Sequence, residues 1–342
     1  MLKPDQRIAI YMEGFLDDPD GKMGHSMIRY APNPVVAVID SRFAGKTVLD
    51  VIQLPRNCPI VTNVKEARAL GAEVLLLGTT PTGGLIPPEC LAEVERALQL
   101  GMCVINGLHD RLGPRFPQLR PGQWIWDIRQ EPKGVKTGAC RARRLPNKRV
   151  VMLGTGMCIG KMTAGIEIWK AARARGIRAE FLATGQCGIA IMGKGVPLDA
   201  VRLDYACGVI EQLVLSVADA ELILVEGQGA ITHPASSATL PLIRGTCPTH
   251  LILCHRAGMT HLDAHPWVKL PPLSRLARLY EDIAEACGAF ARPVTAGVSL
   301  NTGDLDEAAA RQAVQEAEQE TGLPATDPVR FGAEKLLAAL GF

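Results

Sequence analysis

The chain has 342 residues, which is long enough for two domains of ordinary size, each with its own core. Its formal charge of +2 argues against a nucleic-acid-binding surface, although a small anionic ligand remains compatible with it. No apolar run approaches the roughly 18 residues that span a bilayer, and the first residues, MLKPDQRIAIYMEG, lack the apolar core of a secretory signal. We therefore expect a soluble, cytoplasmic protein without a membrane or nucleic-acid partner.

The ten cysteines are scattered along the chain and include no C-x-x-C pair. Zinc sites and disulfide frameworks usually show such closely spaced cysteines. We therefore expect neither a metal site nor a disulfide framework.

Short apolar, β-branched runs alternate with helical patterns along the chain, which is typical of parallel βαβ units. In the first half the predicted strands are RIAIYM (7–12), VVAVI (35–39), EVLLLG (73–78) and CVI (103–105), and together they indicate a Rossmann-like sheet. The stretch QEPKGVKTGACRARRLPNKR (130–149) is basic and rich in turn-forming residues, which indicates a linker or crossover. We place the domain boundary near residue 147, with domains at 1–147 and 148–342.

The second half continues the alternation of strands and helices. The strand VVML (150–153) runs into a glycine-rich loop, which is followed by a helix over 161–175. Further strands are predicted at 179–183, 221–227, 250–255 and 293–301, with helices near 199–217 and 273–288 and two more at the C-terminal end. The predicted fold class is α/β, with an N-terminal Rossmann-like domain and a C-terminal parallel-sheet domain of the P-loop NTPase type.

The stretch GTGMCIGKMTAG (154–165) is a variant of the Walker A pattern G-x-x-x-x-G-K-[ST]. In that pattern, backbone N–H groups and the lysine bind phosphates, and the final hydroxyl binds Mg²⁺. Met162 occupies the hydroxyl position, and its thioether is a poor ligand for a cation that prefers oxygen. Either Thr163 reaches the metal instead, or the loop binds phosphates without breaking them. The predicted phosphate-binding residues are Gly154, Thr155, Gly156, Gly160, Lys161, Met162 and Thr163.

Several polar residues follow predicted strands of the second half. Glu226 lies at the end of the strand in LILVEGQGAITHP (222–234), and Gln228 and His233 come soon after it. Because open parallel sheets bind ligands outside the carboxyl ends of their strands, we expect these three residues beside the loop. Further candidates for substrate contact are Gln186, Asp204 and His255. Asp204 could instead be a helix-surface carboxylate, and His255 could make only a structural hydrogen bond.

In the first half, DGKMGHSMIRY (20–30) is expected to form a glycine-containing loop that presents Lys22, His25 and Arg29. Such a cationic group suits a carboxylate or a phosphate, and arginine can grip either with two parallel hydrogen bonds. The alternative is a solvated loop.

With GTGMCIGKMTAG, ATGQCGIAIMGKGVPLDAV and VEGQGAITHP in this order, the sequence resembles a bacterial and archaeal P-loop family of formerly unknown function that includes a D-glutamate N-acetyltransferase. The resemblance covers nearly the whole chain and implies a C-terminal domain similar to dethiobiotin synthetase. It implies transfer of an acetyl group from acetyl-CoA to the amine of D-glutamate. The loop around Lys161 would then meet the phosphates of coenzyme A, with Glu226 and His233 beside it. No phosphoryl group moves in this reaction, so Met162 is compatible with it.

In such a reaction the acceptor ammonium must lose a proton, and Glu226 and His233 are the candidate bases. Gln228 or glycine N–H groups would stabilise the oxyanion, and Arg29 with His25 would bind the acceptor's carboxylates. An ATP-dependent ligase or kinase of the dethiobiotin synthetase type, using ATP with Mg²⁺, is the alternative, and a non-catalytic nucleotide sensor is a third. The identity and chirality of the acceptor stay open, and we expect a homo-oligomer.

Overall fold

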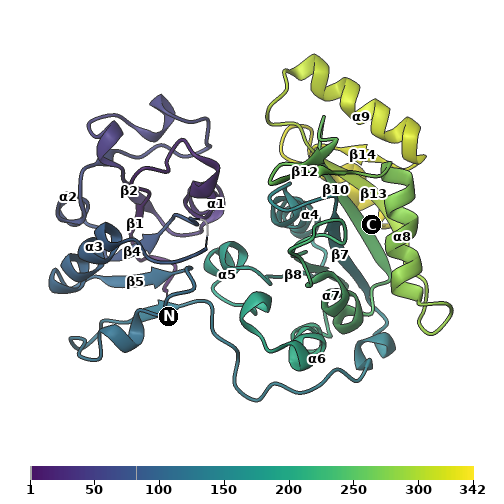
Figure 1. The fold of residues 1–342 in the computed structure, drawn as a ribbon, viewed down its shortest axis with the longest axis horizontal. Coiled ribbons are helices and arrows are strands. Elements are labelled where there is room, and N and C mark those ends of the chain that lie inside the picture. Colours follow the sequence, from purple (N-terminus) through teal and green to yellow (C-terminus); the bar gives the residue numbers. More distant parts are fainter. Residues whose placement is uncertain (1, 82) are drawn as a thin grey trace. The chain divides into compact units, whose positions relative to one another are not determined.

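The computed structural model describes residues 2–81 and 83–342 and consists of two compact units (Figure 1). The first unit contains residues 1–130 together with 186–200, and the second contains 131–185 together with 201–342. The second unit thus begins at Glu131, ahead of the boundary expected near residue 147. The basic stretch belongs to this unit because Arg141 forms an ion pair with Glu211, a buried residue of helix α6 (Leu203–Leu215), at 2.7 Å.

The first unit is built on a six-stranded parallel sheet in the order β3-β2-β1-β4-β5-β6. The strands are β1 (Ile8–Tyr11), β2 (Val35–Ile39), β3 (Ile60–Val61), β4 (Val74–Leu77), β5 (Cys103–Asn106) and β6 (Ile125–Asp127). This is the strand order of a Rossmann sheet, in which the winding reverses between β1 and β4. The predicted Rossmann-like domain is confirmed.

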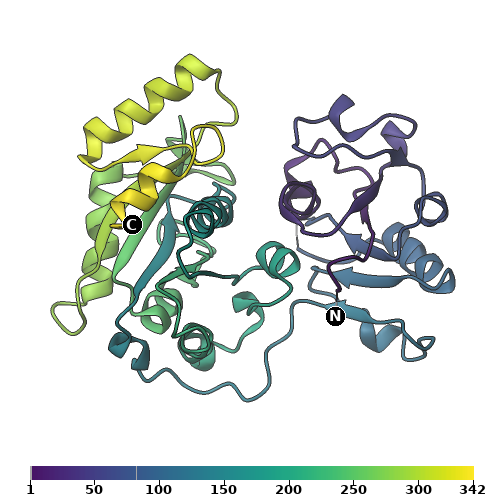
Figure 2. The same cartoon turned by 180° about the vertical axis from the view of Figure 1, so that it is seen from behind.

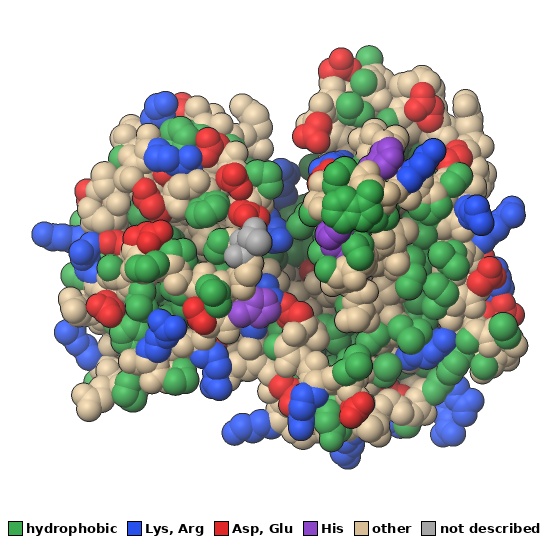
Figure 3. Space-filling model, viewed as in Figure 1, with side chains coloured by type: hydrophobic (Ala, Val, Ile, Leu, Met, Phe, Trp, Pro, Cys, Tyr) green, Lys and Arg blue, Asp and Glu red, His purple; other side chains and the backbone are tan. Residues whose placement is uncertain are grey.

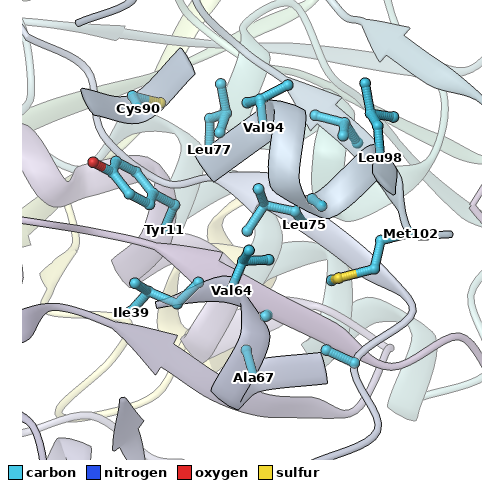
Figure 4. Packing of buried hydrophobic residues seen from close by; sticks show 14 of the residues in the cluster. Tyr11, Ile39, Val64, Ala67, Leu75, Leu77, Cys90, Val94, Leu98 and Met102 are labelled. Atoms are coloured by element: carbon cyan, nitrogen blue, oxygen red, sulfur yellow. The ribbon is translucent and has the colours of Figure 1, made fainter. Parts of the chain in front are cut away.

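Helices α2 (Val64–Ala69) and α3 (Pro88–Gln99) pack on this sheet through a buried apolar cluster (Figure 4). Val64 and Ala67 of α2 and Val94 of α3 meet Leu75 and Leu77 of β4 in this cluster, and all five side chains are fully buried. Burying a valine or leucine side chain contributes about 1.5–3 kcal/mol, so this cluster is a large part of what holds the sheet and the two helices together.

Residues 22–30 form a helix, and the loop predicted there is wrong. Helix α1 (Lys22–Tyr30) buries Met23, Met27 and Ile28, whose spacing places them on one helical face. Gly24 lies on the same face, where a Cβ would overlap the Met12 side chain, so this glycine serves close packing and not a turn. Helix α1 also contacts α5 (Gln186–Met192), which is part of the first unit although its neighbours in sequence belong to the second.

The second unit is built on another six-stranded parallel sheet, in the order β14-β13-β10-β7-β9-β8. Its strands are β7 (Lys148–Gly154), β8 (Ala179–Leu182), β9 (Leu222–Val225), β10 (His250–Arg256), β13 (Val294–Asn301) and β14 (Ala325–Thr326). The strands predicted in this half are confirmed. β11 (His261–Leu262) and β12 (His265–Lys269) form a separate antiparallel hairpin.

Helices lie on both faces of this second sheet. The helices are α4 (Lys161–Ala174), α6, α7 (Thr239–Thr246), α8 (Leu273–Glu285), α9 (Glu307–Thr321) and α10 (Glu334–Ala339). Helix α8 lies in front of the sheet in Figure 1, and α10 lies in front of it in Figure 2. Short 3₁₀ turns occur at Pro19–Gly21, Ser41–Phe43, Val48–Asp50, Gly113–Arg115, Arg141–Arg144 and Leu198–Ala200. None of the helices in residues 2–81 and 83–342 is long and apolar enough to cross a bilayer.

Candidate functional site

The glycine-rich loop connects the carboxyl end of β7 to the first turn of α4. Gly160 has a φ of 102°, a left-handed conformation that favours glycine, and it lets the chain turn directly into the helix. Among the described residues, no hydrogen bond uses the backbone N–H of Gly156, Ile159 or Gly160 as donor. Free N–H groups at the start of a helix form a binding site for an anion, and the helix dipole adds to the attraction.

Lys161 is the first residue of α4, and its side chain lies beneath the loop. The residue is 7% exposed, and its Nζ donates to the carbonyl oxygen of Gly156 at 2.6 Å. Burial lowers the pKa of Lys161, because an ammonium group loses hydration inside the protein. Lys161 and the free N–H groups therefore lie together where the loop enters α4, which is the arrangement that phosphate binding requires.

Glu226 follows β9 directly and is 4% exposed. Its Oε2 accepts hydrogen bonds from the backbone N–H groups of Thr184 at 2.8 Å and Gly185 at 3.0 Å, and the Gln228 side chain also bonds to the carboxylate. Burial raises the pKa of Glu226 to about 7, against the lowering effect of these hydrogen bonds and of Lys161. A carboxylate with this pKa can accept a proton near neutral pH.

Gly227 explains how Glu226 comes close to Lys161. A Cβ at this position would overlap the carbonyl oxygen of Met152 on β7 and would lie 3.0 Å from Cδ of Lys161. Only glycine allows the chain after β9 to pass this close to β7.

Two hydroxyl groups from outside the loop connect it to the segments around it. The Tyr280 hydroxyl, on α8, donates to the Gly154 carbonyl at 2.6 Å and accepts from the Ile231 N–H at 3.2 Å. The Thr232 hydroxyl donates to the Thr155 carbonyl at 2.9 Å. Tyr280 was not predicted, because it belongs to no motif and follows the loop by more than 100 residues. Thr232 lies within LILVEGQGAITHP but was not singled out there.

His255 lies at the end of β10 and contacts the loop. Its Nδ1 is 2.9 Å from the Thr155 hydroxyl. Burial lowers the pKa of His255 to about 4, with Arg256 adding to the effect, so the ring is neutral at pH 7.

His233 is half-buried, and its Nδ1 accepts the backbone N–H of Ala235 at 3.2 Å. A neutral ring that accepts at Nδ1 carries its proton on Nε2, so His233 offers a donor at its outer nitrogen. Burial lowers the pKa of His233, and His265 and Lys161 lower it further. The ring meets His265 edge-on at 4.9 Å, and His265 meets the exposed Trp267 at 5.2 Å. Figure 3 shows histidine and exposed hydrophobic side chains close together on this unit.

The other predicted residues are more dispersed. Met162 and Thr163 lie in the first turn of α4 and are partly exposed. Asp204 is exposed in the first turn of α6 and has no hydrogen bond or ion pair within the described part of the chain. No group of three His, Cys, Asp or Glu residues in 2–81 and 83–342 is placed to hold a metal ion.

Three of the predicted substrate-binding residues belong to the first unit. His25 and Arg29 lie on α1, and the Nε2 atom of His25 is 2.7 Å from the Leu16 carbonyl oxygen. Burial lowers the pKa of His25. Gln186 begins α5, beside Gly107. The second unit thus brings Lys161, Glu226, Gln228, His233 and His255 around one loop, while the roles of His25, Arg29 and Gln186 stay predictions.

Comparisons with known proteins agree with this architecture and with the resemblance read from the motifs. Residues 136–337 match the "Domain of unknown function (DUF1611_C) P-loop domain", and residues 41–131 match the corresponding "Rossmann-like domain". A D-glutamate N-acetyltransferase of Tritonibacter scottomollicae is 36% identical over 283 residues, or 81% of this chain and 84% of the relative. Another, of a Pseudoalteromonas species, is 31% identical over 284 residues with the same coverage. The crystal structure of a DUF1611 family protein from Anabaena variabilis is 46% identical and has a TM-score of 0.96, covering 98% of this chain and 99% of that one. The chain belongs to the DUF1611 family.

Proposed function

We propose that this protein is an N-acetyltransferase that moves an acetyl group from acetyl-CoA to the amine of D-glutamate or a similar amino acid. The names of the two relatives support the reaction class. The observation that carries the proposal is a buried carboxyl group with a pKa of about 7, that of Glu226, next to the lysine of a phosphate-type loop.

The loop residues fit the phosphates of acetyl-CoA. The unpaired N–H groups of Gly156, Ile159 and Gly160, together with Lys161, would hold them. Bound acetyl-CoA would supply the acetyl thioester. Acetyl transfer, unlike phosphoryl transfer, needs no Mg²⁺ ligand, so a methionine at position 162 is tolerated.

Glu226 is the proposed base that takes the proton from the acceptor's ammonium group. With a pKa of about 7, about half of its carboxyl groups are ionised at neutral pH. The two N–H groups of Thr184 and Gly185 hold the carboxylate in one orientation, which keeps it aimed during the reaction.

His233 and Gln228 are the proposed hydrogen-bond donors to the oxygen on which negative charge develops. The Nε2–H of His233 follows from the hydrogen bond at its Nδ1, and this tautomer favours a donor role over the role of base. Gln228 lies against Glu226, so its amide group is held beside the base.

The test measures thiol release from acetyl-CoA in the presence of D-glutamate or L-glutamate, with and without EDTA. We expect release with D-glutamate that persists in EDTA. Phosphate release from ATP is measured in parallel, because a ligase or kinase would need Mg²⁺ for it. Chelator-sensitive ATP turnover without acetyl transfer to any amino acid would contradict the proposal and support the ligase or kinase alternative.

A further inference from the structure

A cavity of about 990 Å³ lies at the amino end of the second sheet, away from the glycine-rich loop. Its lining includes Cys140, Cys247 and five arginines, Arg143, Arg144, Arg149, Arg244 and Arg292. Arg149 is the second residue of β7 and Gly154 is the last, so the cavity and the loop are about 16 Å apart at 3.3 Å per residue. The cavity is therefore separate from the candidate active site, and it contains part of the basic stretch to which the proposed reaction gives no role.

Two cysteines that are 107 residues apart in sequence meet in this cavity. The Sγ atoms of Cys140 and Cys247 are 3.4 Å apart, and both residues are only partly buried. Both also have left-handed backbones, with φ of 55° and 45°, which non-glycine residues adopt at a cost. Such conformations persist where the surrounding structure imposes them, and they are frequent at functional sites.

Four of the five arginines keep their positive charge available, whereas Arg292 is ion-paired with Glu281, Asp282 and Glu285. Arg143 and Arg144 are exposed, and within the described residues their side chains have no carboxylate partner. Arg149 donates from Nε and Nη1 to backbone carbonyls and to the Asn147 side chain. Arg244 donates to two carbonyls of α8. The cavity wall is therefore cationic, and it favours an anionic reactant.

We propose that Cys140 and Cys247 form a reversible disulfide by reaction with an anionic low-molecular-weight disulfide, which the arginines attract into the cavity. One cysteine thiolate attacks a sulfur of the small disulfide, forms a mixed disulfide and releases one small thiolate. The second cysteine thiolate then attacks the protein sulfur, closes the intramolecular bond and releases the other small thiolate. Two protein thiols are oxidised, and one small disulfide is reduced to two thiols.

Burial and the adjacent Cys140 raise the pKa of Cys247, while the Arg143 N–H and Arg149 act in the opposite direction. Only thiolates attack disulfides, and the 3.4 Å between the two sulfur atoms lets either cysteine close the bond once the other is in a mixed disulfide.

The first test treats the folded, reduced protein with glutathione disulfide, blocks free thiols and maps disulfides by peptide mass spectrometry. We expect a peptide pair joined through Cys140 and Cys247, which is lost in Cys140→Ser and in Cys247→Ser and is reversed by dithiothreitol. Cys287→Ser is the matched control, because Cys287 is exposed and, like the pair, has a left-handed backbone, with φ of 57°. It should leave the joined pair unchanged. Finding only mixed disulfides with glutathione, or a different intramolecular pair, would overturn the proposal.

The second test separates the effect of the arginines' charge from the general accessibility of the two cysteines to a small disulfide. Arg143→Gln with Arg144→Gln should slow closure by glutathione disulfide about fivefold or more at low salt, and should change closure by the neutral bis(2-hydroxyethyl) disulfide less than twofold. Arg143→Lys with Arg144→Lys keeps the charge and should keep the rate. Equal slowing with both reagents would overturn the assignment of an anionic reactant.

Discussion

Replacing Glu226 with glutamine tests the buried carboxyl group on which the proposed chemistry depends. The pKa of Glu226 is raised from 4.5 to about 7, so between these pH values the unfolded chain releases the proton first. The contribution of this group to stability is therefore complete below pH 4.5 and is lost as the pH rises through about 7. Each tenfold difference in proton affinity between the folded and unfolded states corresponds to about 1.4 kcal/mol. The rise of the pKa from 4.5 to about 7 therefore corresponds to a loss of about 3 kcal/mol.

Glutamine cannot ionise, but its side-chain oxygen can still accept from the N–H groups of Thr184 and Gly185. The free energy of unfolding of Glu226→Gln relative to the wild type should therefore rise by about 3 kcal/mol from pH 4 to pH 8. Urea unfolding followed by circular dichroism at the two pH values measures this difference, and all other titrating groups cancel in the comparison. Glu167→Gln, on the partly exposed side of α4, is the matched control.

If the free energies of unfolding of Glu226→Gln and the wild type differ by the same amount at pH 4 and pH 8, the reasoning is refuted. The carboxyl group would then not be held in a desolvated site. The same variant should lower turnover by about 100-fold or more if Glu226 is the base, with little change in acetyl-CoA affinity. If Glu226→Gln kept the turnover of the wild type, another residue would have to be the base.

Four further outcomes follow from the geometry. Lys161→Ala should weaken coenzyme A binding at least about tenfold, measured by calorimetry. The control Lys170→Ala, on the outer side of α4, should leave the affinity unchanged. Equal affinities of Lys161→Ala and the wild type would mean that the loop is only a turn. The wild-type turnover number should rise with pH and level off above about 7, because the base must be ionised; a flat profile from pH 5.5 to 8.5 would exclude Glu226 as the base. Met162→Thr should leave acetyl transfer in EDTA roughly intact, and a large gain in Mg²⁺-dependent ATP turnover would point to phosphoryl transfer instead. Tyr280→Phe removes the hydrogen bonds to Gly154 and Ile231 and should lower the free energy of unfolding by about 1–3 kcal/mol in urea titration; an unchanged value would mean that these groups find other partners.

Local patterns in the sequence were sufficient to predict most of the fold. A β-strand and an α-helix have different periods, and each apolar run shows its period within a few residues. Most strands of the two sheets could therefore be predicted, and so could the position of Glu226 at the end of β9, whereas the short strands β3, β6 and β14 were not predicted. The pattern was misleading at residues 22–30, where glycine was interpreted as a loop signal but in fact allows α1 to pack against Met12.

The chemistry of the site depends on distances between residues that are far apart in the chain. The pKa of Glu226 depends on burial by surrounding segments, and the tautomer of His233 depends on one backbone hydrogen bond. No sequence pattern reports either, because desolvation and hydrogen bonding are set by packing in three dimensions.

The sequence by itself determined the alternation of strands and helices, the glycine-rich loop between β7 and α4, and the family motifs, because each is written in neighbouring residues. Only the tertiary structure decided that α5 packs with the first unit, that Tyr280 bonds to the loop, and that Cys140 meets Cys247 across 107 residues. The physical reason is that periodicity identifies the apolar face of an element but not its partner. The partner is selected by the packing of the whole core, to which distant residues contribute as much as near ones.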